Sequence, residues 1–262
     1  MSQVPNSYNE AKRNVNWPSW KVAIDKELFA LNKNKTWNIV DRPSNKQILT
    51  SRWVFRVKTD CNNVDSFKAR LVIRGCEQNS DSFNEIYVPV AKLTTVRTFL
   101  SVCLQKQLKI IQLDVCNAFL NGDLKEEIFM EIPQGYNSND GNNSALSNKV
   151  CKLNKALYGL KQAPKSWNEK LNGFLIKIRF TRSKSDYCMY TMKIGDSVVY
   201  LLTYVDDFLM ASNDEELLSD VKCKLQNEFL MKDLNNVEQF LGINLHYDVH
   251  RKLITLDISR VL

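Results

Sequence analysis

The sequence is poor in the residues that build metal or disulfide scaffolds. It has two histidines, and none of its seven cysteines stands in a Cys-x-x-Cys pair, so neither a zinc site nor a disulfide framework is expected. No apolar run approaches the roughly 20 residues of a membrane helix, and residues 1–17 lack the apolar stretch of a secretory signal. There is no internal repeat. These absences predict a soluble protein of a reducing compartment with no membrane partner.

The remaining composition is that of a globular protein with unevenly distributed charge. Of its 262 residues, 44% are hydrophobic and 25% are charged, and the net charge is +7. Residues 1–75 carry 14 Lys and Arg against 6 Asp and Glu, and residues 149–184 carry 10 against 1. The other two blocks, 76–148 and 185–262, are acidic. A basic surface attracts polyphosphates such as DNA or RNA, although spare surface lysines explain the same counts equally well.

Hydrophobic periodicity predicts interspersed helices and hairpins. Four amphipathic helices are expected: around Trp20–Leu31, after an N-cap at Thr94 or Thr95, around Trp167–Ile178, and after an N-cap at Asp214. The expected strands are 53–58 and 67–75 around a turn at 61–65, then 110–115, 198–210, and a hairpin of 240–245 with 253–258. Residues 137–148 are predicted to be an exposed loop. The mixture favours an α+β fold over a parallel sheet.

Carboxylates stand at two positions where charge is costly. Asp114 ends a short apolar strand, and the pair Asp206-Asp207 interrupts a long apolar run. Adjacent acids repel each other, and a neighbouring low-dielectric sheet increases that repulsion. A divalent cation would relieve it, and Mg²⁺ typically takes one or two carboxylates plus substrate phosphates. A plain turn is the alternative, because Asp is favoured in turns.

Several motifs together carry a family resemblance. The segment Tyr204-Val205-Asp206-Asp207, set between apolar strands, resembles the Tyr-x-Asp-Asp box of reverse transcriptases. Residues 113–124 (LDVCNAFLNGDL) resemble the first catalytic motif in its copia-type form, and residues 150–167 (VCKLNKALYGLKQAPKSW) resemble a further motif. Residues 68–72, 89–91 and 240–242 follow in the expected order. The resemblance, to the reverse transcriptase domain of copia-type LTR retrotransposons, covers the chain from about Trp17 onward.

The resemblance implies a right-hand polymerase of the α+β class. Fingers and a palm with an antiparallel sheet are expected, whereas most of a thumb is absent. The implied parts are an N-terminal helical segment (1–36), fingers (37–92 and 122–163), a palm (93–121 and 164–245), and the end of the primer-grip hairpin with the start of a truncated thumb (246–262).

The resemblance also implies a two-metal centre. Asp114 and Asp206 would bind two Mg²⁺ ions, with Mn²⁺ as a substitute, and the backbone carbonyl of Val115 matches a further metal ligand. Asp207 belongs to the same catalytic and metal-binding set, with a less direct contact. The ions would activate the primer hydroxyl and stabilise the leaving pyrophosphate.

Five residues match positions at which the family binds the incoming nucleotide: Lys68, Arg70, Phe119, Tyr158 and Gly159. Lys68 and Arg70 would meet the triphosphate, unless they are simply solvated strand residues. Phe119 would lie under the sugar and exclude a 2′ hydroxyl, unless it is a core residue. Tyr158 and Gly159 would pack against nucleotide and template, since glycine permits close backbone approach.

Nucleic-acid contacts are implied at Lys161 and Lys165, on template phosphate, and at Leu241 and Gly242, at the primer end. The rings of Trp53, Tyr158 and Trp167 would serve as base-stacking platforms or as core. The implied partners are an RNA or DNA template with its primer and deoxynucleoside triphosphates. The oligomeric state is left open.

Two functions follow from the sequence. The first is an RNA-directed DNA polymerase domain of a retrotransposon polyprotein, working in cytoplasmic virus-like particles. The second is a truncated, non-catalytic remnant that at most binds nucleic acid through its basic face. The intact acids at 114, 206 and 207 favour catalytic design, whereas the short C-terminal end favours the remnant.

Overall fold

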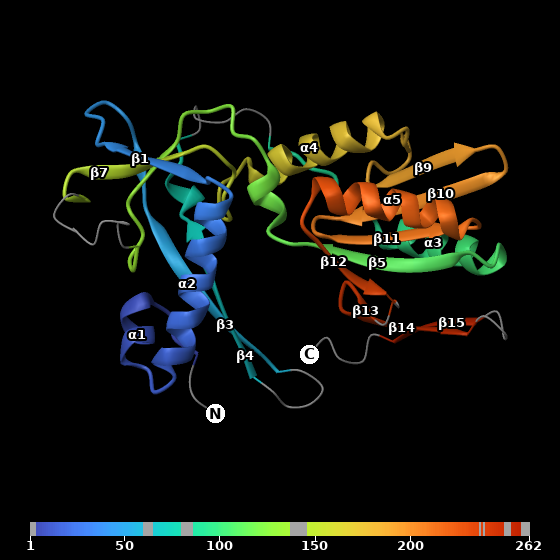
Figure 1. Cartoon of the computed structure of the whole chain (residues 1–262), viewed down its shortest axis with the longest axis horizontal. Coiled ribbons are helices and arrows are strands. Elements are labelled where there is room, and N and C mark those ends of the chain that lie inside the picture. Colours follow the sequence, from blue (N-terminus) through green and yellow to red (C-terminus); the bar gives the residue numbers. More distant parts are fainter. Residues whose placement is uncertain are drawn as a thin grey trace. The chain divides into compact units, whose positions relative to one another are not determined.

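The computed structural model describes residues 4–59, 65–79, 86–136, 146–235, 237, 239–248 and 253–257. The chain divides into two compact units (Figure 1). The first unit comprises residues 1–86 and 119–167, and the second comprises residues 87–118 and 168–262. Within the described ranges, no helix combines the length and hydrophobicity that crossing a membrane requires.

The first unit contains two helices, a small sheet and a long hairpin. The helices are α1 (Tyr8–Arg13) and α2 (Trp17–Lys33). The sheet has the order β1-β7-β6-β2, formed by Trp37–Asp41, Lys149–Leu153, Phe129–Met130 and Ile48–Leu49. The hairpin pairs β3 (Ser51–Thr59) with β4 (Asp65–Ile73) in antiparallel register, with Trp53 opposite Leu71. The 3-10 turns are η1 (Gly75–Glu77) and η3 (Ala118–Asn121), the second of which begins at the last residue of the other unit.

Helix α2 has the apolar face that its periodicity predicts, with Trp20, Ile24 and Leu31 buried, and it packs against β4. The Trp20 ring contacts Phe55 and Phe67 of the hairpin edge-on, with ring centroids 5.1 and 4.6 Å apart. Such aromatic contacts add to the burial of apolar area and hold the helix on the hairpin.

Trp53 and Trp167 are core residues, only 4% and 2% exposed. The core reading therefore holds for both rings, and neither is a base-stacking platform. Tyr158 is half-buried.

The second unit is built on a six-stranded antiparallel sheet of order β12-β5-β11-β10-β9-β8 (Figure 1). Its strands are Met231–Asn235, Lys109–Val115, Asp207–Ser212, Ser197–Tyr204, Met189–Ile194 and Thr181–Arg182. Helix α5 (Glu215–Glu228) packs against β10 and β11. Helices α3 (Leu93–Gln105) and α4 (Ala163–Lys177) are the others, and α4 begins within the first unit.

A three-stranded sheet follows, with β13 (Gln239–Phe240), β14 (Ile243–Asp248) and β15 (Leu253–Asp257). The predicted pairing of 240–245 with 253–258 is confirmed for β14 and β15, whereas Phe240 belongs to a separate short strand. Residue 258 lies outside the described residues, as do most of the predicted turn at 61–65 and most of the loop at 137–148.

The predicted helix caps have mixed outcomes. Asp214 caps α5 and accepts a hydrogen bond from the N–H of Leu217 at 3.0 Å, as predicted. The prediction that Thr94 or Thr95 caps α3 is wrong, because the N-cap residue is Lys92. The Asp186 carboxylate, remote in sequence, accepts from the Lys92 N–H at 3.1 Å and from the Thr95 hydroxyl at 2.5 Å. A charged acceptor from elsewhere in the chain thus takes the capping role.

The mixture of helices and mainly antiparallel sheets agrees with the predicted α+β class. Every strand pair named here is antiparallel except β2 with β6. Antiparallel strands joined by tight turns can bring acidic residues from separate parts of the chain to one end of a sheet.

Candidate active site

The three predicted acids meet at one end of the second unit's sheet. Asp114 in β5 stands directly opposite Asp207 in β11. Directly opposed residues of an antiparallel pair lie about 4.5–5.5 Å apart at Cα and place their side chains on the same face. The N–H of Val115 donates to the carbonyl of Asp206 at 2.8 Å. The strand register therefore brings together acids from sequence positions 114, 206 and 207.

The turn that carries Asp206 has an unusual backbone. Residues 205 and 206 connect β10 to β11, and Tyr204 pairs with Asp207 across the turn. Val205 has a φ of +56°, in the left-handed region that β-branched residues strongly disfavour. Strain of this kind persists only where the surrounding structure imposes it, and it is concentrated at functional sites.

The acid cluster has the donor chemistry of a magnesium site. Across the described part of the chain, no three His, Cys, Asp or Glu side chains form a group that would hold a metal by themselves. Mg²⁺ does not require such a cage, because it usually takes one or two carboxylates and completes its shell with water and phosphate. The side chains of Asp114, Asp206 and Asp207, all half-buried, fit that mode of binding.

The first unit brings together three of the predicted nucleotide-binding residues. The Arg70 guanidinium lies over the Tyr158 ring, 4.5 Å from its centroid. The Phe119 ring meets the same tyrosine edge-on at 4.8 Å. Lys68 is exposed on the same face of β4 as Arg70, since the two residues are one pleat apart. Two aromatic rings and two cations thus share a neighbourhood.

Close backbone contacts attach the end of β4 to residues 158 and 159. The N–H of Ile73 donates to the Tyr158 carbonyl at 2.8 Å. Gly159 has a φ of +97°, and a Cβ there would overlap the Ile73 carbonyl. A Cβ on Gly75 would overlap the Gly159 carbonyl. Glycine is therefore required at 159 for both space and backbone angle, which explains its position in the predicted motif.

A buried amide pair lies beside the predicted template contact Lys161. The Gln78 amide donates to Gln162 Oε1 at 3.0 Å and accepts from the Lys161 N–H at 3.0 Å. Both glutamines are at most 5% exposed, and the Gln162 Nε2 has no hydrogen-bond partner within the described structure. Sequence reasoning missed this pair; the signal was Gln162 itself, which stands inside the quoted motif. Lys165, also half-buried, follows in α4.

The predicted primer-end residues form the turn between β13 and β14. Leu241 and Gly242 have φ values of +54° and +78°. Leu241 packs against the core of the second unit, whereas Gly242 is exposed. The structure thus places them in the same unit as the acids.

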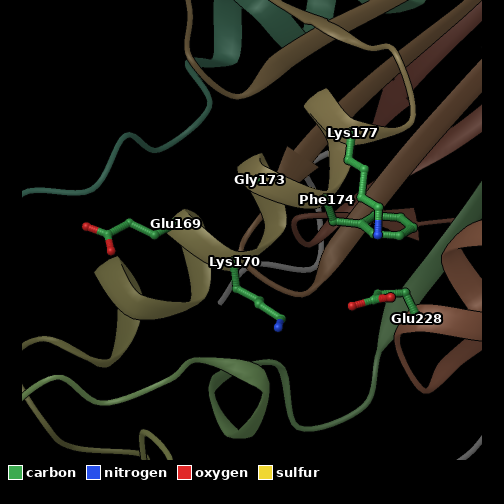
Figure 2. Close-up of a pocket in the computed structure, with 6 residues that line it drawn as sticks. All are labelled: Glu169, Lys170, Gly173, Phe174, Lys177 and Glu228. Carbon is green, nitrogen blue, oxygen red and sulfur yellow. The ribbon is translucent and has the colours of Figure 1, made fainter.

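A pocket of about 290 Å³ in the second unit is separate from the acids (Figure 2). It is lined by Glu169, Lys170, Gly173, Phe174, Lys177 and Glu228. Figure 2 shows Lys170 and Glu228 directed toward the same space. With two cations and two carboxylates in its lining, the pocket has no preference for ligands of one charge sign, and none of the three acids lines it.

The chain belongs to the family described as reverse transcriptase (RNA-dependent DNA polymerase), whose pattern it matches over residues 34–260. It is similar to the Retrovirus-related Pol polyprotein from transposon TNT 1-94 of Nicotiana tabacum, with 41% identity over 227 residues. It is also similar to the Retrovirus-related Pol polyprotein from transposon RE1 of Arabidopsis thaliana, with 38% identity over 247 residues. The Ty1-OR Gag-Pol polyprotein of Saccharomyces cerevisiae is 29% identical over 239 residues.

These matches cover 85%, 90% and 86% of the chain but only 17%, 16% and 13% of the respective relatives. The chain therefore spans less than a fifth of the length of these polyproteins. The resemblance to the reverse transcriptase domain of copia-type elements is confirmed.

Proposed function

We propose that the chain is an RNA-directed DNA polymerase domain of a retrotransposon polyprotein, adding deoxynucleotides to a primer. The observation that carries the proposal is the register of β5 with β11, which sets Asp114 opposite Asp207 beside the Asp206 carbonyl. Family membership supports the same reaction.

The acids would hold the divalent ions on which reverse transcriptases generally depend. Asp114, Asp206 and the Val115 carbonyl are the proposed ligands of two Mg²⁺ ions, which Mn²⁺ can replace. When bound, these ions supply activation of the primer hydroxyl and charge neutralisation on the leaving pyrophosphate. Asp207 lies across from Asp114 and adds negative charge that retains cations at this end of the sheet.

The first unit would supply the nucleotide contacts. Arg70 and Lys68 offer cations to the triphosphate, where they offset negative charge as it develops. Phe119, held against Tyr158, presents a ring that leaves no room for a 2′ hydroxyl and so favours deoxynucleotides. Gly159 allows the backbone to approach the nucleotide closely.

The proposed architecture is a right hand working on a template with its primer. It has a helical segment (1–36), fingers (37–92 and 122–163), a palm (93–121 and 164–245), and a primer-grip end leading into a thumb (246–262). Lys161 and Lys165 would contact template phosphates, and Leu241 and Gly242 would contact the primer end. The proposed location is a cytoplasmic virus-like particle.

Primer extension tests the proposal. The chain should extend oligo(dT) on poly(rA) with dTTP and Mg²⁺, and Asp206→Asn should abolish extension. The matched control is Asp196→Asn, which changes an exposed acid in the neighbouring β9–β10 hairpin and should leave extension unchanged. Salt-sensitive binding of poly(rA)·oligo(dT) without any extension would instead support a remnant that only binds nucleic acid.

A further inference from the structure

Glu27 is an acid in the first unit to which the proposed reaction assigns no role. It lies on α2 next to the buried positions Ile24, Leu28 and Leu31, on the side of the helix that packs against β4. Its Oε1 accepts a hydrogen bond from the N–H of Leu71 at 3.4 Å, longer than an ordinary hydrogen bond. A carboxylate placed at such an interface loses hydration, so its partners there must compensate for the loss.

The second partner of Glu27 is Arg70, the residue before Leu71. Burial raises the pKa of the Glu27 carboxyl, whereas the Leu71 N–H and the charge of Arg70 oppose that rise. Arg70 in turn lies over the ring of Tyr158. The guanidinium is therefore subject to two attractions, one from the aromatic face and one from a carboxylate on α2.

We propose that Glu27 is a positioning residue for the incoming nucleotide, which fixes the edge of β4 at Leu71 and orients the Arg70 guanidinium over Tyr158. The inference rests on the proposed function, because it takes Arg70 to be the triphosphate contact. Arg70 is exposed, and a free arginine side chain occupies many rotamers, so orienting it in advance reduces the entropy lost on binding.

Two effects of Glu27 on a bound triphosphate have opposite signs. Its negative charge repels the triphosphate, and its hold on Arg70 favours the triphosphate. The repulsion is weakened by solvent and salt at this exposed face. The orientation of Arg70 is not screened in this way, so the favourable effect dominates and loss of the charge should weaken nucleotide binding.

The first test measures the contact itself and does not require polymerisation. The Glu27 carboxyl carbon is followed by NMR during a pH titration and is assigned by its absence in Glu27→Gln. In Arg70→Ala the pKa of Glu27 should rise, because a neighbouring positive charge is lost. An unchanged pKa would show that the two groups do not interact and would overturn the proposal.

The second test measures the consequence for dTTP. Glu27→Gln keeps an oxygen that accepts from the Leu71 N–H but removes the charge. It should raise the KM for dTTP about fivefold, equivalent to ~1 kcal/mol, with little change in kcat or in the melting temperature. In the Arg70→Ala background the same change should have no further effect, since the orienting role is already lost.

Asp25→Asn is the matched control, because Asp25 stands on the same helix but is exposed and paired with Lys21 at 3.1 Å. It should leave the KM unchanged. A merely structural Glu27 would lower the melting temperature and act additively with Arg70→Ala, and that result would overturn the proposal, as would an unchanged or lower KM in Glu27→Gln.

Failure of the proposed function would look different from failure of this inference. If Arg70→Ala leaves the KM for dTTP unchanged, Arg70 does not bind the triphosphate, and the role of Glu27 falls with it. If Arg70→Ala raises the KM but Glu27→Gln does not, the polymerase assignment stands and only the role of Glu27 is wrong. A wild-type chain that extends no primer at all would overturn both.

Discussion

The two units hold their proposed functional residues in different ways. In the second unit, the acids are placed by backbone pairing: Asp114 and Asp207 occupy opposed positions of adjacent strands. In the first unit, Arg70 and Phe119 are placed by side-chain contacts with Tyr158, whose backbone is attached to the end of β4. Backbone pairing is insensitive to side-chain identity, whereas side-chain stacking and glycine contacts depend on it. Substitutions should therefore separate chemistry from folding cleanly in the second unit and poorly in the first.

The largest expected effect is that of Asp114→Asn. Asparagine keeps the size of aspartate, and the β5–β11 pairing uses backbone groups, so the fold should persist. Loss of a metal-binding charge costs several kcal/mol in the transition state, and single-turnover extension should fall about a thousandfold or more. Circular dichroism should match the wild type. Loss of the native spectrum would show that the acid is structurally required and would break the comparison.

An intermediate effect is expected from Gly159→Ala in the first unit. The added Cβ would overlap the Ile73 carbonyl at a φ of +97°, so the free energy of unfolding should fall by about 2–4 kcal/mol in urea titration. Gly195→Ala is the matched control, because Gly195 also has a positive φ, +57°, but has open space around it. That variant should lose only about 1 kcal/mol. Equal losses would mean that the contact between residues 73 and 159 contributes nothing.

The smallest expected effect is that of Asp186→Asn in the second unit. Burial would raise the pKa of this carboxyl, but hydrogen bonds from Thr95, Cys188 and Lys92 outweigh burial and leave the pKa below its ordinary value. A lowered folded-state pKa stabilises the protein above the unfolded pKa, and this stability is lost as the pH falls through the folded pKa.

Asp186→Asn should therefore reduce the unfolding free energy by about 2 kcal/mol at pH 7, because hydrogen bonds to a charged acceptor are lost. It should also weaken the decline in stability below about pH 4, where aspartates are protonated. Urea titrations at pH 7 and pH 3 measure both. A decline as steep as that of the wild type would show that other acids cause it.

Local pattern predicted much of the fold because it depends on neighbouring residues. The apolar spacing of α2, the alternation of β3 and β4, and the cap at Asp214 are features of short segments. The α3 cap was mispredicted for the corresponding reason: its acceptor is Asp186, which no pattern near Thr95 contains.

The acids were identified from the sequence because charge inside an apolar strand is conspicuous, and their family motif surrounds them. Glu27 and the Gln78–Gln162 pair were not identified, because Glu27 looks like any helical surface acid and Gln78 stands in no motif. Their significance depends on which backbone groups lie opposite them.

The order of residues along this chain alone settles its family and the positions of its strand-end aspartates, since both are carried by contiguous motifs. Only the tertiary structure decides that Glu27 contacts Leu71, that Asp186 caps α3, and that Gly159 lies under Ile73. Each of these contacts joins segments distant in sequence, and their geometry is set by the packing of whole helices and strands, which no local pattern encodes.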